Sequence, residues 1–414
     1  MPVSPISTPV SYALPTSAIL QDQAQLTSLD QQMATGLAVQ SPADNPSAAA
    51  GSLQLGQQLS ALNLDGATAG IAQSSLQNLS STVGSISTLV QSLRQTALAA
   101  ANATTNSQDR QALADSVSQG LRQLVQLGNT QTPDGNYLLS GSQSNTQPFN
   151  SNGSGVAYQG DAGTSALQIA PGLTIPTSLS GQFLLMDIPT GNGYAMATAS
   201  SGNTGTATVS VNGVDNLAAA TAMDTGNQSY TLGFATSSGS GVTQTTYAVT
   251  NASGAVVSSG AYTQGASIDV AGNQITINGN PAAGDTFTIA PAKNQSLFQT
   301  VSQLAGLLTQ GASNGAEGAQ FSQGISNAIS NLNQGLTRLL TGQSVIGSSL
   351  AQIGAISGIN QTQSSNDQIA QSDLISANLP AVATQFEQGS TALQAALSAF
   401  SAMQGLNLFA TLKF

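Results

Sequence analysis

Two stretches, one in the first quarter of the chain and one in the last, carry apolar residues that recur at steps of three and four. Such spacing places the side chains on one stripe of a helix, as in the seam of a coiled coil or long bundle. We therefore predict a mainly α protein with a β insertion: a rod-like antiparallel helical bundle or coiled coil formed by both ends, plus a middle antiparallel β domain. The rod core is predicted to contain Leu76, Leu79, Val83, Ile86, Val90, Leu93, Ile325, Ile329, Leu332, Leu336 and Leu339.

The two ends of the chain carry similar apolar stripes. We predict that residues 1–40 and 372–414 form terminal arms, which pair with each other and with neighbouring subunits. The bundle rod is expected over 41–145 and 293–371, and the β-rich outer domain over 146–292. The residues expected to pack the arms are Ile19, Leu26, Leu29, Met33, Leu379, Val382, Phe386, Leu393, Leu397, Phe400, Leu406, Leu408 and Phe409.

Helix-breaking residues set the expected helix boundaries. Four prolines, the last at Pro15, predict a non-helical tail to about residue 16, because proline removes a backbone donor and crowds the preceding turn. The pair Asp65-Gly66 allows a break in the long helix expected over 47–102. Near the other end, two long helices are expected over 319–359 and 372–406.

The first arm helix is expected to end in a turn that starts the next helix. Gly36 suits the C-terminal cap, where a positive φ is common. Asp44 or Asn45 can cap the N-terminus of the following helix, and Pro46 suits its first turn.

The middle of the chain alternates apolar and polar residues with a period of two. Short alternating runs separated by turn residues are typical of an antiparallel sandwich or barrel-like module. Asn212-Gly213 and Asn278-Gly279 are predicted turn sites. The residues that define the alternation include Val209, Val211, Leu232, Phe234, Ile268, Val270, Ile275, Ile277, Phe287 and Ile289.

Charge is scarce along this chain of 414 residues. Charged residues make up 6% of it, against roughly 25% in typical soluble proteins, and the net charge is −11. No basic patch exists, so neither nucleic acid nor an anionic membrane surface is expected as a partner. No apolar run is long enough to cross a bilayer, and the first residues lack the pattern of a cleaved secretory signal. A surface of Gln, Asn, Ser and Thr favours dense packing against copies of itself.

The residue types also restrict catalysis. With no His and no Cys, catalytic triads that use His, thiolate chemistry and His- or Cys-based metal sites are excluded, and no cofactor is expected. Asp224-Thr225-Gly226 matches the tripeptide of aspartic proteases, but that chemistry needs two such carboxylates and the chain has one. We interpret the tripeptide as a turn between strands, and we expect no enzyme activity.

Four segments carry a resemblance to a known family. They include the turn made of Ser41, Pro42, Ala43, Asp44, Asn45 and Pro46, and the stretch 134–149 that follows the front helices. The others are the stretch 279–289 and the C-terminal pattern over 391–409. Together they resemble the hook–filament junction proteins of the bacterial flagellum, which are relatives of flagellin. Two departures are Leu37-Ala38, where the family commonly has a basic residue, and the near absence of charge in the arms.

This resemblance implies a structural role in motility. Such proteins are exported unfolded and uncleaved through the flagellar type III channel, with help from an export chaperone. Their arms are loose in the monomer and become ordered on assembly. The implied location is extracellular, in a ring between another hook-associated protein and the first flagellin subunits.

Three alternatives remain open from the residues. The first is flagellin itself, because the turn after the first helix and the C-terminal helix are shared with it. The second is a secreted adhesin that binds a ligand through its β domain. The third is an enzyme that uses Asp224 as its acid.

A chain with so few charges should tolerate acid. Near pH 3, below the usual Asp pKa of about 3.9, most of its 17 carboxylates become protonated, yet few charge pairs exist to be lost. We expect the helicity of the arms, measured by circular dichroism, and assembly to change little down to pH 3, as suits an acidic habitat. A sharp loss between pH 5 and pH 3 would contradict this.

Overall fold

The computed structural model describes residues 8–102, 106–152, 155–239, 242–310 and 315–411. It divides into two compact units. The terminal unit comprises Met1–Ala67 and Ser357–Phe414, and the central unit comprises Thr68–Ile356. The division falls within two long helices, α2 (Pro46–Ala100) and α6 (Gly315–Ile375). The predicted class, mainly α with an antiparallel β insertion, is confirmed.

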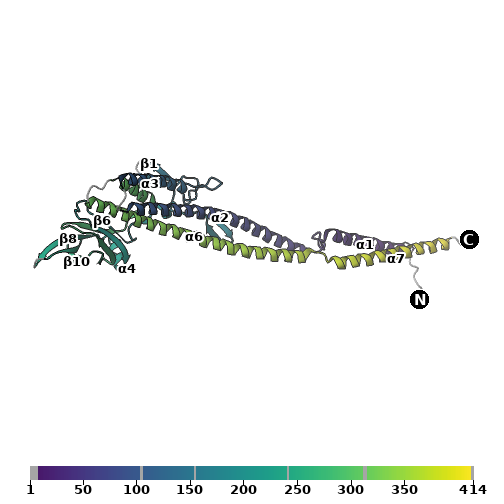
Figure 1. Ribbon diagram of the computed structural model, residues 1–414. Coiled ribbons are helices and arrows are strands. Elements are labelled where there is room, and N and C mark those ends of the chain that lie inside the picture. Colours follow the sequence, from purple (N-terminus) through teal and green to yellow (C-terminus); the bar gives the residue numbers. More distant parts are fainter. Residues whose placement is uncertain (1–7, 103–105, 153–154, 240–241, 311–314, 412–414) are drawn as a thin grey trace. The chain divides into compact units, whose positions relative to one another are not determined.

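In the terminal unit, the first and last helices of the chain lie side by side (Figure 1). They are α1 (Thr8–Thr35) and α7 (Leu379–Thr411). The prediction of a non-helical tail to residue 16 is wrong for its described part, because α1 begins at Thr8 and contains Pro15. A proline inside a helix costs about 3 kcal/mol, so packing against α7 must offset a local cost. The residues before Thr8 lie outside the described part of the chain.

Backbone hydrogen bonds join the two chain segments that lead into this helix pair. Gly36 ends α1 with φ +72°, which confirms its predicted capping role. The N–H of Ala38 donates to the carbonyl of Ile375 at 2.7 Å, and the N–H of Ala377 donates to the carbonyl of Gly36 at 2.8 Å. Backbone hydrogen bonds thus hold residues 36–38 against residues 375–377, although some 340 residues separate the two segments in the sequence.

Helix α6 runs further than its sequence indicated, and α2 lacks the break that Asp65-Gly66 allowed. Helix α2 continues through Asp65-Gly66 without a break, and α6 continues to Ile375 rather than ending at 359. The interruption falls at residues 376–378, where Asn378 caps α7 by accepting from the N–H of Ala381 at 3.3 Å. Helix propensity alone misplaced these ends because Gly and Asn are tolerated inside a helix that another helix packs against.

The central unit has two hydrophobic cores, and the first is helical. Helices α2 and α6 contribute to it together with α3 (Ser107–Gly128) and α5 (Leu297–Thr309). Of the residues expected in the rod core, Ile329 and Leu336 are half-buried. The others are buried, namely Leu76, Leu79, Val83, Ile86, Val90, Leu93, Ile325, Leu332 and Leu339.

Two small hairpins and a π-helix complete this first core. They contribute Phe149, Ile169, Ile175, Leu184 and Leu185, all fully buried among the helices. The expected β domain over 146–292 therefore divides between two cores. The elements are β1 (Phe149–Asn152), β2 (Gly155–Tyr158), β3 (Ala166–Ala170), β4 (Leu173–Pro176), η1 (Gln182–Met186), β5 (Ile188–Pro189) and β14 (Asn294–Gln295).

The second core belongs to the β module, which we define as residues 195–291. Two antiparallel sheets and helix α4 (Leu217–Thr225) contribute to this core (Figure 1). The first sheet has five strands in the order β10-β9-β8-β13-β6, and the second has three strands in the order β11-β12-β7. The strands are β6 (Ala195–Ala199), β7 (Thr208–Val214), β8 (Tyr230–Gly239), β9 (Val242–Asn251), β10 (Val256–Ala261), β11 (Ser267–Val270), β12 (Asn273–Asn278) and β13 (Thr286–Pro291).

Two local predictions in the β module are wrong. Asn212-Gly213 lies inside β7, where Gly213 pairs with Gln274 and a register shift against β12 leaves Asn212 as the extra residue. Asp224 and Thr225 form the last turn of α4 (Leu217–Thr225), with Gly226 as its cap, so they are not a turn between strands. Asn278-Gly279 does end a strand, with φ +91° at the glycine.

Adjacent leucines on α6 provide a matched test of the helical core. Leu339 is fully buried, whereas Leu340 is 61% exposed. We expect Leu339→Ala to lower the free energy of unfolding by about 2–5 kcal/mol, because it removes packed methyl groups and leaves a cavity. Leu340→Ala should change it by less than about 0.5 kcal/mol. Denaturant titration of both variants measures the difference, and equal effects would contradict the core assignment.

Candidate functional site

The helix pair α1/α7 buries few of its apolar side chains. Among the large ones described in the terminal unit, Ile19, Leu29 and Val382 are 7–9% exposed. Of the residues predicted to pack the arms, Leu26, Met33, Phe386, Leu393 and Phe400 are half-buried, Leu379 and Leu397 are exposed, and the side chains of Leu406, Leu408 and Phe409 lie outside the described part of the chain.

The same unit exposes a larger set of apolar side chains. Two paired helices offer each residue one neighbouring helix, so much of each apolar stripe stays in water. Fully burying a side chain of this size gains roughly 1.5–3 kcal/mol relative to leaving it exposed, which favours association. The exposed set, which we call the terminal apolar surface, consists of Leu14, Leu20, Leu53, Leu64, Ile359, Ile369, Leu374, Leu379, Leu397 and Met403.

A shallow groove of about 280 Å³ runs between α1 and α7. A Cβ atom at Gly389 would lie 3.2 Å from the Cδ2 atom of Leu26, so the glycine lets the two helices approach closely at this point. Asp22 and Leu29 line the α1 side, and glutamines line the α7 side.

Polar residues interrupt the seam between α2 and α6 in the terminal unit. Asp367 is 6% exposed, and its Oδ1 atom accepts from Gln363 Nε2 at 2.7 Å. Its Oδ2 atom and Asn360 Nδ2 are buried without a hydrogen-bond partner. Unsatisfied buried polar atoms cost about 1–3 kcal/mol each, so this part of the seam is weak. The search for apolar residues at steps of three and four did not reveal this weak part of the seam. Asn360 and Asp367 nevertheless lie seven and fourteen residues after the buried Ile353, in the same seven-residue repeat of α6.

The turn between α1 and α2 has the predicted capping geometry. Asn45 caps α2 by accepting from the N–H of Ala48 at 3.1 Å, and Pro46 is the first helical residue. Asp44 has a different role, since its Oδ2 accepts from the N–H groups of Ser41 at 2.7 Å and Gln40 at 3.0 Å. These backbone bonds, chiefly that from Ser41, lower the pKa of Asp44 below its ordinary 3.8.

A second carboxylate of the same kind lies in the central unit. Asp161 accepts from the hydroxyl and N–H of Ser142 and from the N–H of Gly163, and the bonds from Ser142 lower its pKa below 3.8. A carboxylate with a depressed folded-state pKa stabilises the fold above its unfolded-state value, and that contribution disappears as the pH falls through the folded-state value. Asp44 and Asp161 therefore lose their stabilising effect only below pH 3.8.

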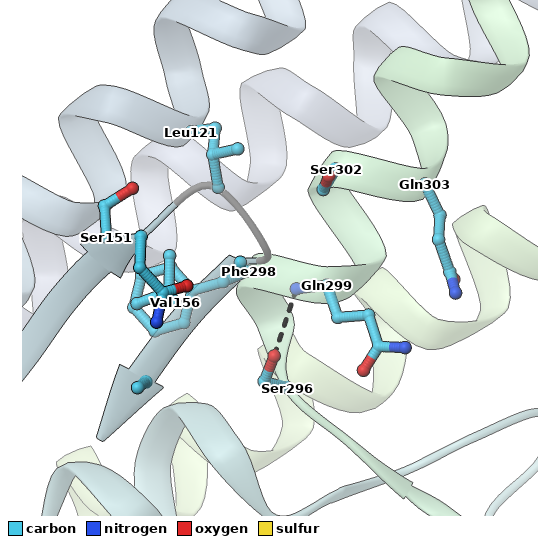
Figure 2. A pocket seen from close by; sticks show the side chains of 11 residues that line it. Leu121, Ser151, Val156, Ser296, Phe298, Gln299, Ser302 and Gln303 are labelled. Carbon is cyan, nitrogen blue, oxygen red and sulfur yellow. Dashed lines mark hydrogen bonds between the residues drawn. The ribbon is translucent and has the colours of Figure 1, made fainter. Parts of the chain in front are cut away.

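A pocket of about 630 Å³ in the central unit lies between the β1–β2 hairpin and α5 (Figure 2). Its wall combines Leu121, Val156 and Phe298 with Ser and Gln side chains, and Ser296 Oγ accepts from the N–H of Gln299 at 3.0 Å. None of its lining residues ionises near neutral pH, so they supply no acid or base. Asp224 lies on α4, outside this pocket.

The described ranges offer neither a metal site nor a membrane span. They contain no group of three acidic side chains arranged to hold a metal ion. None of their helices combines the length and apolar content that crossing a bilayer requires. What the described residues do present is the helix pair and its apolar surface, which suit packing against other protein chains.

Comparison with known proteins places this geometry in a class. Residues 6–144 match the bacterial flagellin N-terminal helical region. Over 145 residues the chain is 29% identical to flagellar hook-associated protein 3 of Salmonella typhimurium, covering 35% of this chain and 45% of that protein. Flagellar hook-associated protein 3 of Escherichia coli is 29% identical to this chain over 144 residues, which cover 34% of this chain and 45% of that protein. The chain thus spans less than half the length of these curated relatives.

The likeness in structure extends further along the chain. The flagellar junction protein FlgL of Legionella pneumophila matches with a TM-score of 0.70 and 27% identity, covering 78% of this chain and 99% of that one. FlgL of Xanthomonas campestris matches with a TM-score of 0.67 at 23% identity, over 77% and 99%, and supports the fold alone. The resemblance to hook–filament junction proteins is confirmed. Those relatives are structural proteins of the flagellum.

The capping residue of α2 offers a direct test of the turn. We expect Asn45→Ala to destabilise the terminal unit by about 0.5–2 kcal/mol, because the N–H of Ala48 loses its acceptor. Asn45→Asp should restore most of the loss, since aspartate caps equally well. Thermal melts followed by circular dichroism measure both variants. If Asn45→Ala melts like the parent, the cap does not stabilise the turn.

Proposed function

We propose that this chain is a structural subunit of the bacterial flagellum, located at the junction between hook and filament. The observation that supports it most is the match to Legionella FlgL over almost the whole of that protein. The neighbours we propose are another hook-associated protein, flagellin and further copies of this chain. Export through the flagellar channel, with a chaperone, belongs to the same proposal.

The physical basis of the proposed role is the terminal apolar surface. Among the described side chains of the terminal unit, ten large apolar ones are exposed and three are buried, so the unit gains from packing against neighbours. A helix pair of this kind becomes fully ordered when further helices cover it. We propose that α1 and α7 associate with the corresponding helices of adjoining subunits and that the arms become ordered in the process.

The junction role is favoured over that of a filament subunit. The match over residues 6–144 is to a flagellin region. Both a junction protein and a filament subunit would give this match, so it does not distinguish the two roles. The structural match to FlgL extends into the β elements and covers 78% of this chain. No catalytic role is proposed, because the pocket in Figure 2 is lined by groups without acid–base function.

Deletion and complementation test the proposal. Cells that lack this chain should build a hook and release flagellin into the medium without forming a filament. The wild-type chain should restore the filament. A Leu20→Gln/Leu397→Gln variant should not, because it makes the terminal apolar surface polar, whereas the matched variant Leu217→Gln on α4 should. Filaments of normal length in the deletion strain would overturn the junction role.

A further inference from the structure

The five-stranded sheet of the β module has one protected edge and one open edge. At the protected edge, strand β6 meets α6, where Asn327 Nδ2 donates to the carbonyl of Ala197 at 3.0 Å. At the other edge, β10 pairs with β9 and has no strand beyond it in the described sheet. Its outer backbone groups are therefore free to pair with an incoming strand.

The open edge has no charged residue or proline to protect it against pairing. Natural edge strands carry charges, prolines, inward-pointing charged groups or bulges that interrupt pairing. Here residues 225–268, which include all of β8, β9 and β10, contain no charged residue and no proline. Val256 and Val257 are 60% and 54% exposed. A register shift lies between Val256 and Ser258, but Ser258–Ala261 continue in regular antiparallel register.

The sheet face beside this edge is uncharged as well. Cross-strand partners form a row of threonines, Thr198 with Thr288, Thr288 with Thr231, and Thr231 with Thr250, and Val256 pairs with Thr250 at its end. The hydroxyl of Thr250 donates to the carbonyl of Thr231 at 3.3 Å. Packing another protein against this row of threonines and β10 therefore buries no charged side chain.

We infer that β10 pairs antiparallel with the β10 strand of a second copy of this chain. A two-fold axis makes two identical edge strands antiparallel, which is the arrangement of an isologous strand–strand interface. Each copy carries a net charge of −11, so copies repel unless they meet where charge is absent. The uncharged segment 225–268 provides such a place, and a charged peptide would find no countercharge in it.

Single-cysteine cross-linking of the full chain tests the inference, because the natural chain has no cysteine. Cysteine is introduced singly at each position from Val256 to Ala261, and Leu217→Cys on α4, with 58% exposure, serves as the matched control. Under mild oxidation in solution, positions near the two-fold axis should give several-fold more disulfide-linked dimer than the control. Adding Val257→Lys to the best of the other five variants should abolish the excess, because each copy would bring a charged side chain into an interface that offers no countercharge.

The outcomes separate this inference from the proposed function. If none of the six variants exceeds Leu217→Cys in dimer yield while circular dichroism shows a normal fold, the β10 interface does not exist. Dimers that persist with Val257→Lys would likewise overturn it. Val257→Lys in the deletion strain reports on the junction role independently. Restoration of the filament by this variant leaves that role intact whatever the cross-linking result.

Discussion

The structure depends on the line of α6 residues that recur every seven positions and face α2. In the central unit these residues are apolar and fully packed, and in the terminal unit two of them are polar with unpaired buried atoms. A polar residue in a helical seam restricts register at a cost in stability. One continuous helix thus supplies a firm core to one unit and a weak one to the other. The seven positions are Ile325, Leu332, Leu339, Ile346, Ile353, Asn360 and Asp367.

This difference connects sequence to the proposed role. The central unit buries many of its leucines and isoleucines in two cores of its own. The terminal unit leaves ten large apolar side chains exposed and has few charges to set its pairing. Shape and apolar contact would therefore guide the proposed assembly. Hydrogen bonds lower the pKa of Asp44 and of Asp161, so acid removes the contribution of these two carboxylates only below pH 3.8.

The sequence predicted those features that arise from local chemistry. Seven-residue periodicity identified the buried seam, and the residues before Pro46 offered Asp44 or Asn45 as the cap, of which Asn45 takes that role. What it missed depends on tertiary context. Pro15 remains helical because α1 packs against α7, and Asn212-Gly213 fits a strand because the pairing of β7 with β12 shifts at Asn212. Asn360 and Asp367 were overlooked because a search for apolar repeats passes over polar residues at the same positions.

Hydrogen exchange in the monomer and in the assembled state tests the central claim most directly. The account predicts that amides of α1 and α7 exchange quickly in the monomer and become strongly protected on assembly, while amides of the central core, such as those around Val83 and Leu332, are protected in both. Equal protection of α1 and α7 in the isolated chain would show that the terminal unit is stable without neighbours and would contradict the account.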